Sequence, residues 1–252
     1  MPFSSHRGQR IHYTVEGAGP LVVLQHGLLL DGASWKQSGL VDALSDRFCV
    51  ACIDSLGHGL SDKPSDPGHY GQEQRAGDIV AVIDDLGYDH VHLIGYSMGA
   101  WISVGVAKYH PRRLSSLILG GWDPIGGLPP GPRGPLSFDK FMMFAMVAAP
   151  ALVNGVTPES EPGLRACFAA FDELQGSGVA LRMHDFPVMM WCGREDGLHD
   201  TVQAFAAAET LPFLSSSGDH MAAVLQPDSV TLKRIRGFVD AAAASGRHRR
   251  SN

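Results

Sequence analysis

The chain has 252 residues, which is enough for one α/β domain with a substantial core or for two small domains. Its 44% hydrophobic and 18% charged residues are typical of a globular protein, and a formal charge of −6 argues against nucleic-acid binding, which needs a large basic surface. No apolar run approaches the roughly 20 residues of a membrane span, and residues 1–10 lack the apolar region of a signal peptide. We therefore expect a protein that does not enter membranes.

Apolar runs bounded by turn residues predict strands, and segments between them predict helices. The predicted strands cover residues 11–15, 21–24, 48–53, 91–94, 114–119, 187–191 and 212–215. The predicted helices cover residues 74–86, 100–109, 201–209 and 229–243, the last with Asp228 as its N-cap. Strands that alternate with helices predict an α/β fold with a mostly parallel, twisted sheet and helices on both faces.

One stretch interrupts this alternation. Residues 124–185 contain no convincing strand, and they begin with a linker rich in glycine and proline over 125–135. Helices are predicted over 137–149 and over 162–175, the second from an apolar stripe of period i, i+3, i+4, i+7. We therefore expect a core formed by residues 1–123 and 186–252, with a helical lid over 124–185 inserted after the strand at 114–119, which corresponds to the sixth strand of the expected fold.

The four cysteines are sparse, which predicts reduced thiols and a cytoplasmic protein. Cys49 and Cys52 have the spacing of a redox pair or half a metal site. They lie in a predicted strand, however, where residues three apart point to opposite faces. We therefore predict buried structural thiols and no metal site.

A serine lies where a predicted strand turns into a predicted helix, in the motif Gly95-Tyr96-Ser97-Met98-Gly99. Small residues on both sides permit such a sharp turn, and the serine hydroxyl at its apex projects above the sheet. This is the geometry of a serine nucleophile. The five-residue pattern alone is weak, since a chain so rich in serine and glycine can contain it by chance.

A serine hydroxyl needs a base, which is normally a histidine oriented by a carboxylate. In an open parallel sheet such groups lie beyond the carboxyl ends of strands. Asp196 and His220 each follow a predicted strand, in the order Ser, Asp, His that this kind of sheet uses. They are the predicted acid and base. Asp123 is the alternative acid, and Asp219 and Asp200 are lesser candidates, with Asp200 better suited to cap a helix.

The attack of a serine creates an oxyanion that needs preorganised N–H donors. One predicted donor is the backbone N–H of Met98, which follows the nucleophile. The other is the N–H of Leu28, because Gly27 permits a close approach in the turn after the strand at 21–24. We expect His26 to stabilise this loop rather than to act as a base.

These residues resemble the α/β-hydrolase superfamily, in its lid-bearing, esterase-like branch, along nearly the whole chain outside the lid. The motifs that carry the resemblance are His26-Gly27 followed by Trp35, Asp54-x-x-Gly57-His58-Gly59-x-Ser61-Asp62, Gly95-x-Ser97-x-Gly99, His110-Pro111-x-Arg113-Leu114, Gly193-x-x-Asp196 and Gly218-x-His220. The resemblance implies structural roles for Asp54 and His58.

Three departures from the family's pattern narrow the expected activity. Ser97 stands where haloalkane dehalogenases and epoxide hydrolases of this family carry aspartate, and Leu29 replaces the proline of a His-Gly-x-Pro loop. The serine disfavours both activities, and the missing proline again disfavours epoxide hydrolysis. The expected lid is also shorter than the family's common four-helix lid.

The sequence therefore predicts a cofactor-independent serine hydrolase for small or medium carboxylic esters, acting through an acyl-enzyme. The substrate is a small molecule, and the protein is a monomer or a homodimer. The candidate substrate pocket contains His26, Trp122, Phe138, Phe141 and Met142. The same triad also serves hydrolysis of lactones, thioesters or C–C bonds, and perhydrolysis. A ligand receptor or sensor with slow turnover is the alternative from another class.

Overall fold

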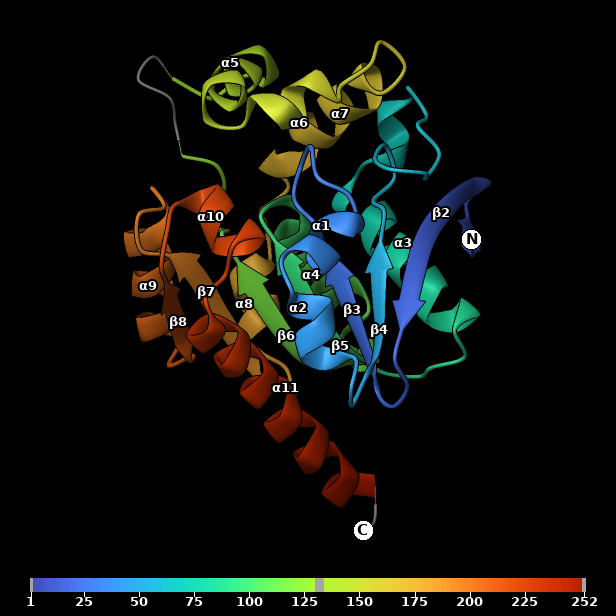
Figure 1. Ribbon diagram of the computed structural model, residues 1–252, viewed down its shortest axis with the longest axis vertical. Helices are drawn as coiled ribbons and strands as arrows, with labels where there is room; N and C mark the ends of the chain where they lie inside the picture. The colour runs from blue at the N-terminus through green and yellow to red at the C-terminus, as the bar shows by residue number, and fades with distance from the viewer. Residues whose placement is uncertain (1, 130–133, 251–252) are drawn as a thin grey trace.

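The computed structural model describes residues 2–129 and 134–250. Within these residues, one eight-stranded sheet with the order β1-β2-β4-β3-β5-β6-β7-β8 forms the centre (Figure 1). The pairs β1–β2 and β2–β4 are antiparallel, and the neighbours from β4 to β8 are all parallel. The strands are β1 (Phe3–His6), β2 (Gln9–Glu16), β3 (Leu21–Gln25), β4 (Cys49–Ile53), β5 (Val91–Tyr96), β6 (Leu114–Gly120), β7 (Val188–Gly193) and β8 (Phe213–Ser216). The mostly parallel sheet predicted from the sequence is confirmed.

Strand β1 was not predicted. Its sequence is mostly polar, and it lies at the edge of the sheet, where only β2 pairs with it, Phe3 facing His12 and His6 facing Gln9. An edge strand of this kind lacks the apolar run that marks a strand covered on both faces.

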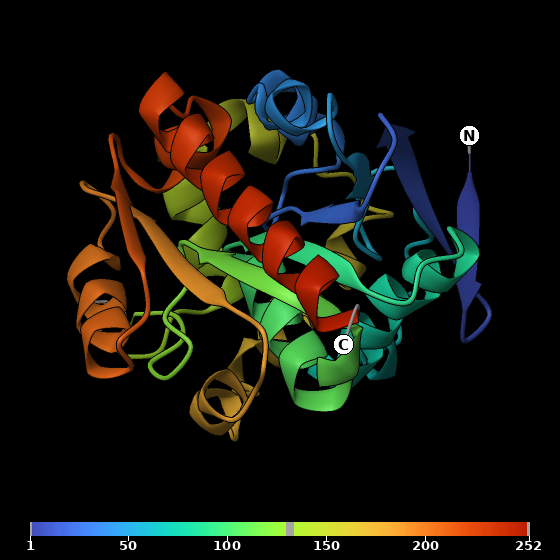
Figure 2. The same cartoon turned by 90° about the horizontal axis from the view of Figure 1, so that it is seen from below.

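Helices cover both faces of the sheet. On one face lie α1, α2 and α11, and Figure 2 shows α11 crossing the strands diagonally; α3, α4 and α8 lie on the other face. The short helices α1, α2, α6, α8 and α10 were not predicted, because five or six residues are too few to show a helical period. The helices are α1 (Ala33–Gln37), α2 (Leu40–Leu44), α3 (Gln72–Asp85), α4 (Met98–Tyr109), α5 (Phe138–Ala148), α6 (Pro150–Asn154), α7 (Glu161–Ala169), α8 (Ser177–Arg182), α9 (His199–Ala208), α10 (His220–Leu225) and α11 (Ser229–Arg250).

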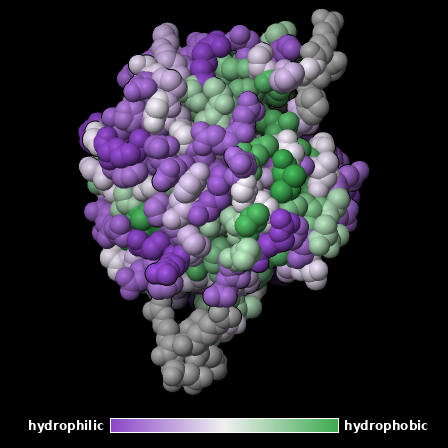
Figure 3. Space-filling model, turned by 180° about the vertical axis from the view of Figure 1, so that it is seen from behind, coloured by the Kyte–Doolittle hydropathy of each residue, from purple (hydrophilic) through white to green (hydrophobic). Residues whose placement is uncertain are grey.

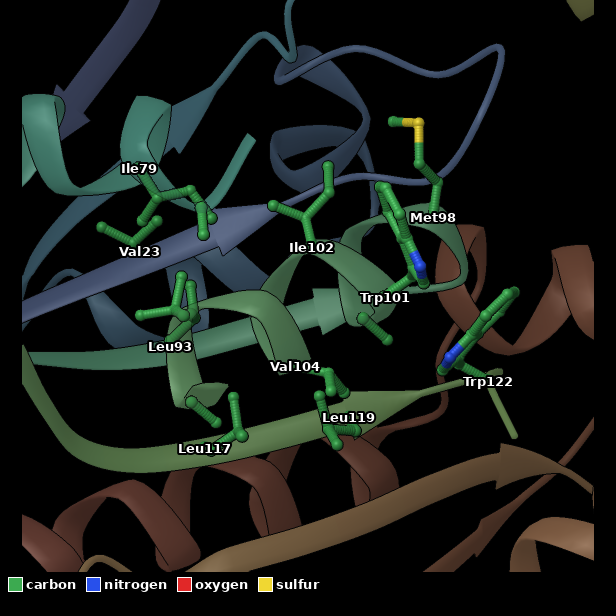
Figure 4. Packing of buried hydrophobic residues seen from close by; sticks show 14 of the residues in the cluster. Val23, Ile79, Leu93, Met98, Trp101, Ile102, Val104, Leu117, Leu119 and Trp122 are labelled. Carbon is green, nitrogen blue, oxygen red and sulfur yellow. The ribbon is translucent and has the colours of Figure 1, made fainter. Parts of the chain in front are cut away.

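The apolar strands separate two hydrophobic cores. Val23 packs with Ile79 of α3 in one core (Figure 4), and its neighbour Val22 packs with Leu44 of α2 in the other. Alternate residues of a strand point to opposite faces, so a strand between two helical layers must be apolar throughout. Cys49 and Cys52 are free and buried in different cores, which confirms the interpretation as structural thiols.

The N-termini of α11 and α9 test the two N-cap residues that the sequence predicts. Asp228 accepts a hydrogen bond from the Thr231 N–H at 2.7 Å, as expected of the residue that caps α11. Asp200 does not cap α9, because it lies within the first turn of that helix and Leu198 occupies the N-cap position. The expected cap at Asp200 is therefore wrong.

The segment between β6 and β7 is helical, as predicted, and no strand is assigned in its described residues. Helices α5, α6 and α7 lie at the top of Figure 1, beyond the carboxyl ends of the parallel strands, whereas α8 packs beside α4. The helix expected over 162–175 is shorter: α7 ends at Ala169 and a 3-10 turn, Ala170–Asp172, follows it. None of the helices in the described part of the chain combines the length and apolarity needed to cross a bilayer.

Candidate active site

Ser97 lies at the turn between β5 and α4, with φ 55° and ψ −118°, a conformation that is strained for a residue with a side chain. Its backbone N–H donates to Gly120 O at 2.7 Å, which ties the turn to β6. A Cβ atom at Gly95 would lie 2.3 Å from Gly99 O, and one at Gly99 would lie 2.0 Å from Gln25 O. The two glycines are therefore required for this turn to pack against β3, and the motif read from the sequence has a steric cause.

His220 and Asp196 are brought together by the ends of two neighbouring strands. Asp196 follows β7, and His220 follows β8 as the first residue of α10. His220 Nδ1 lies 2.6 Å from Asp196 Oδ2, and the other carboxylate oxygen accepts the Leu198 N–H at 3.0 Å. Because the carboxylate can only accept, Nδ1 carries the proton and Nε2 is left to accept one. This is the tautomer a general base requires.

Asp196 is ionised at neutral pH. Burial raises the pKa of its carboxyl group, but hydrogen bonds from His220, Leu198 and Cys192, together with the His220 charge, outweigh burial and hold that pKa below its usual value. The Asp196 side chain is only 4% exposed, whereas that of His220 is 35% exposed. The acid is thus enclosed, and the base is open to a substrate.

Two glycines connect the base to the serine turn. Gly120 O accepts the Ser97 N–H, and a Cβ atom at the next residue, Gly121, would lie 3.0 Å from His220 Cε1. Tyr96 adds a second link, because its hydroxyl donates to His220 O at 2.7 Å. No sequence pattern pointed to this tyrosine. Ser97, His220 and Asp196 therefore converge at one edge of the sheet.

The loop after β3 packs against the nucleophile. A Cβ atom at Gly27 would lie 3.3 Å from Ser97 Cβ, so the close approach expected of this glycine is present. Among the hydrogen bonds of the described residues, neither the Leu28 N–H nor the Met98 N–H donates to a protein group. The two predicted oxyanion donors thus stay predictions, and no protein acceptor in the described part of the chain occupies either of them.

His26 is fully buried and stabilises this loop. Its Nδ1 bonds to Gly27 O at 2.8 Å, and its Nε2 accepts the Ser55 N–H at 3.0 Å. Burial lowers the pKa of His26, so the neutral ring matches these two bonds. Both ring nitrogens are occupied and the residue is fully buried, so these contacts agree with the expected role in the loop and not with a place in the candidate pocket.

Asp54 organises the neighbouring loop. Its carboxylate accepts hydrogen bonds from the backbone N–H groups of Gly32 and Leu60, both at 2.8 Å, and Oδ2 lies 2.9 Å from His12 Nδ1. His58 is buried beside it, with its ring 5.1 Å from that of His26. These contacts agree with the structural roles implied for Asp54 and His58.

The alternative acids have other partners. Asp123 accepts the Ile125 and Gly126 N–H groups at 2.9 and 2.8 Å within its own turn. Asp219 caps α10 by accepting the N–H groups of the two residues after His220, and the Asp200 side chain is fully exposed. The histidine is therefore paired with Asp196 and with none of these three.

Aromatic side chains join α5 and α7 to the core at the same edge. Phe168 packs with Phe138 and Phe141 at ring distances of 5.8 and 5.3 Å, and Phe171 packs with Trp122 at 5.6 Å. Trp122 and Phe138 are almost wholly buried, and Phe141 and Met142 are half-buried. Trp122 and Phe138 thus serve packing, which leaves Phe141 and Met142 as the open part of the candidate pocket.

A groove of about 980 Å³ lies at the opposite edge of the sheet, at the amino ends of β3, β5, β6 and β7. Its lining contains none of the candidate catalytic, oxyanion-hole or pocket residues.

Comparison with known proteins gives a consistent result. A family model described as alpha/beta hydrolase fold matches residues 20–147, just over half of the chain. The cis-3-alkyl-4-alkyloxetan-2-one decarboxylase of Shewanella oneidensis is 36% identical over 121 residues, which are 46% of this chain and 37% of that protein. The 2-(acetamidomethylene)succinate hydrolase of Mesorhizobium japonicum is 38% identical over 103 residues, or 41% of this chain and 36% of that protein. The chain thus spans little more than a third of the length of these two relatives.

Among solved structures, the enol-lactonase from Burkholderia xenovorans superposes with a TM-score of 0.76 and 21% sequence identity. The superposition covers 95% of this chain and 100% of the other. Agreement at this identity shows a shared fold over 95% of the chain, whereas the family model ends at residue 147.

Proposed function

This chain belongs to the α/β-hydrolase family, and we propose that it is a serine hydrolase for small or medium carboxylic esters. The observation that carries the proposal is the 2.6 Å bond between His220 Nδ1 and Asp196 Oδ2, beside a serine held at positive φ. That bond leaves Nε2 of His220 as a proton acceptor, at the edge of the sheet where the turn between β5 and α4 carries Ser97.

In the proposed reaction, His220 Nε2 takes the proton of Ser97 as Oγ attacks the ester carbonyl. The N–H groups of Leu28 and Met98 stabilise the oxyanion, and the alcohol leaves with the proton from His220. Water then enters, loses a proton to His220 and attacks the acyl-enzyme, which releases the acid and restores Ser97. The chain's own groups supply the nucleophile, base and oxyanion donors, so the proposal requires no cofactor or metal.

A fluorophosphonate probe tests this assignment directly. We expect Ser97→Ala to abolish labelling and to lower turnover of p-nitrophenyl acetate by orders of magnitude. Ser217→Ala is the matched control, because Ser217 is an exposed serine near His220 whose hydroxyl donates to Asp228. Normal turnover by Ser97→Ala would refute the proposal, and loss of labelling in Ser217→Ala would point to a general disturbance of this edge.

We propose that α5, α6 and α7 form a lid and that Phe141 and Met142 contact the acyl group. In support, these side chains are half-buried beside Phe168. Met143, Phe144 and Val147 are 71%, 57% and 86% exposed, so α5 has more apolar surface than its packing on the core uses. The back face of the molecule likewise carries a band of hydrophobic residues on its right half (Figure 3).

The acyl preference can be measured with esters of different length. The acyl chain of p-nitrophenyl hexanoate has four more methylene groups than that of the acetate, and burial of each contributes up to about 0.8 kcal/mol. If part of the acyl chain is buried, kcat/KM should be about 10- to 100-fold higher for the hexanoate. Phe141→Ala should reduce this ratio. Equal turnover of the two esters would remove the apolar acyl pocket from the proposal.

Lactone hydrolysis is the second candidate. The Shewanella relative is named for an oxetan-2-one, a cyclic ester, and the Burkholderia structure is an enol-lactonase. A lactone uses the same attack by Ser97, with the alcohol remaining attached to the acyl group. A panel of lactones and p-nitrophenyl esters, each assayed with Ser97→Ala as control, ranks the two classes by kcat/KM.

A receptor or sensor of slow turnover would show acylation of Ser97 at one equivalent without steady-state product.

We place the hydrolase in the cytoplasm, as a monomer or homodimer, and the free, buried state of all four cysteines supports a reducing compartment. Sedimentation of the purified protein gives the oligomeric state.

A further inference from the structure

We propose that Tyr96 is a positioning residue that fixes the backbone of the base His220 through its hydroxyl group. The inference rests on the proposed function, because it concerns the same base. Tyr96 stands next to the nucleophile in the chain, yet its side chain reaches a residue 124 positions later.

Two contacts join Tyr96 to His220. The Tyr96 hydroxyl donates to His220 O at 2.7 Å, and the two rings lie 5.2 Å apart with an interplanar angle of 54°. Tyr96 is itself fixed, since it is 1% exposed and its ring packs edge-on against Trp191 at 5.0 Å. A rigid side chain thus holds both the main chain and the ring of the base.

The space for this ring is made by two glycines. A Cβ atom at Gly120 would lie 2.4 Å from Tyr96 Cδ2, and one at Gly121 would lie 2.8 Å from Tyr96 Cζ. The same Cβ at Gly121 would lie 3.0 Å from His220 Cε1. Tyrosine and histidine therefore share a space that larger residues at the end of β6 would fill.

The hydroxyl acts as the donor in this bond, because a carbonyl oxygen can only accept. Burial raises the pKa of Tyr96 well above its usual value, and the Asp196 carboxylate adds to the shift, so the group stays protonated. His220 O belongs to the first residue of α10, and its bond to Tyr96 is a contact from outside the helix. Without it, Asp196 still orients the ring of the base and Asp219 still caps α10, but this bond from β5 to the main chain of the base is lost.

Small displacements of a base are costly, because proton transfer requires hydrogen-bond geometry between base and nucleophile. Loss of one neutral hydrogen bond should slow reaction of Ser97 by about fivefold to tenfold. Binding of the substrate should be unaffected, since Tyr96 is buried. The effect therefore belongs in kcat and not in KM.

The test compares Tyr96→Phe with Tyr70→Phe. Tyr70 is the matched control, because it is also fully buried and its hydroxyl also donates to a backbone carbonyl, Pro64 O, at 2.7 Å. The measurements are kcat and KM for p-nitrophenyl acetate, the rate constant of fluorophosphonate inactivation, the thermal midpoint, and the downfield proton NMR signal of the His220 Nδ1–H. Incorporation of p-aminophenylalanine at position 96 restores a donor.

We expect Tyr96→Phe to lower kcat and the inactivation rate about fivefold to tenfold with KM unchanged within twofold, and to weaken the Nδ1–H signal. Tyr70→Phe should leave all of these at wild-type values, and p-aminophenylalanine should restore them. Wild-type rates and signal in Tyr96→Phe, or equal losses in both variants, would overturn the inference. If Tyr96→Phe does not fold, p-methylphenylalanine, which keeps the volume without a donor, replaces it in the comparison.

The proposed function and this inference can fail separately. If the wild-type protein neither turns over esters nor reacts with fluorophosphonate, the hydrolase proposal fails. The Nδ1–H signal then still decides whether Tyr96 positions His220: a signal unchanged in Tyr96→Phe overturns the inference, and a weakened one supports it.

Discussion

Replacing Asp196 by asparagine should disable the base while leaving its surroundings in place. The Leu198 N–H can only donate, so the single amide oxygen of the substituted side chain must turn toward it, as Oδ1 does at 3.0 Å. The amide NH2 group then faces His220 Nδ1 at the position of the present 2.6 Å bond. Nδ1 becomes an acceptor, the ring proton moves to Nε2, and His220 can no longer take the proton of Ser97.

The expected magnitude follows from this wrong tautomer. Loss of the correct tautomer in a serine triad lowers kcat by about 10³- to 10⁴-fold, while KM changes little because the carboxylate does not contact substrate. The enclosed position of Asp196, with only 4% of its side chain exposed, leaves little room for water to replace the lost acceptor. We therefore expect the full effect and not a fraction of it.

The assay is steady-state hydrolysis of p-nitrophenyl acetate by Asp196→Asn, with two matched controls. Asp200→Asn changes a fully exposed carboxylate four residues away. Asp123→Asn changes the alternative acid, whose Oδ1 accepts two backbone N–H groups that an amide oxygen can also accept. Both should retain activity within about twofold. A loss of kcat below tenfold in Asp196→Asn, or a loss in Asp123→Asn that exceeds the loss in Asp196→Asn, would refute the assignment of Asp196 as the acid.

Three further predictions concern stability. Ser97→Gly should be more stable than Ser97→Ala by about 1 kcal/mol, because φ 55° is strained for a residue with a Cβ; equal urea midpoints would show that the turn stores no strain. Gly99→Ala should lower the free energy of unfolding by about 1–3 kcal/mol, since its Cβ would lie 2.0 Å from Gln25 O, and an unchanged melting temperature would contradict this packing. Burial lowers the pKa of His92 from 6.5 to about 4, so the unfolded chain binds a proton more readily. The contribution of His92 to the free energy of unfolding is fully present above pH 6.5 and falls by about 2–3 kcal/mol as the pH drops to 4. In His92→Gln, the free energy of unfolding should lack this dependence on pH. Identical pH dependence of the unfolding free energy in the two proteins would exclude this effect.

Much of the fold could be predicted because its signals are local. A parallel strand between two helical layers is apolar on both faces, so β3, β4 and β7 appear as apolar runs, and β5 and β6 as mostly apolar runs that contain His92, Ser115 and Ser116. The motif around Ser97 is recognisable because the turn leaves no room for a Cβ atom at Gly95 or Gly99, so both positions must be glycine. Strand β1 and the helices of five or six residues lacked such signals, since an edge strand is polar and a short helix shows no period.

The candidate pocket was harder to predict. His26 and Trp122 looked available from their places after strands, but burial and hydrogen bonding assign the first to its loop and the second to packing. Which aromatic residue is covered depends on how α7 meets the core, and residues far apart in the chain decide that contact.

The sequence by itself determined the order of strands and helices, the serine turn and the chain order of nucleophile, acid and base, because each depends on neighbouring residues. The sequence favoured Asp196 over Asp123 although both follow a strand, and the tertiary structure supports that choice, since Asp196 is bonded to His220 and Asp123 accepts N–H groups of its own turn. The tertiary structure alone revealed the contact of Tyr96, whose hydroxyl meets His220 O only because β5 and the loop after β8 end at one edge of the sheet. Hydrogen bonds act over about 3 Å in space, and no spacing along the chain encodes that distance.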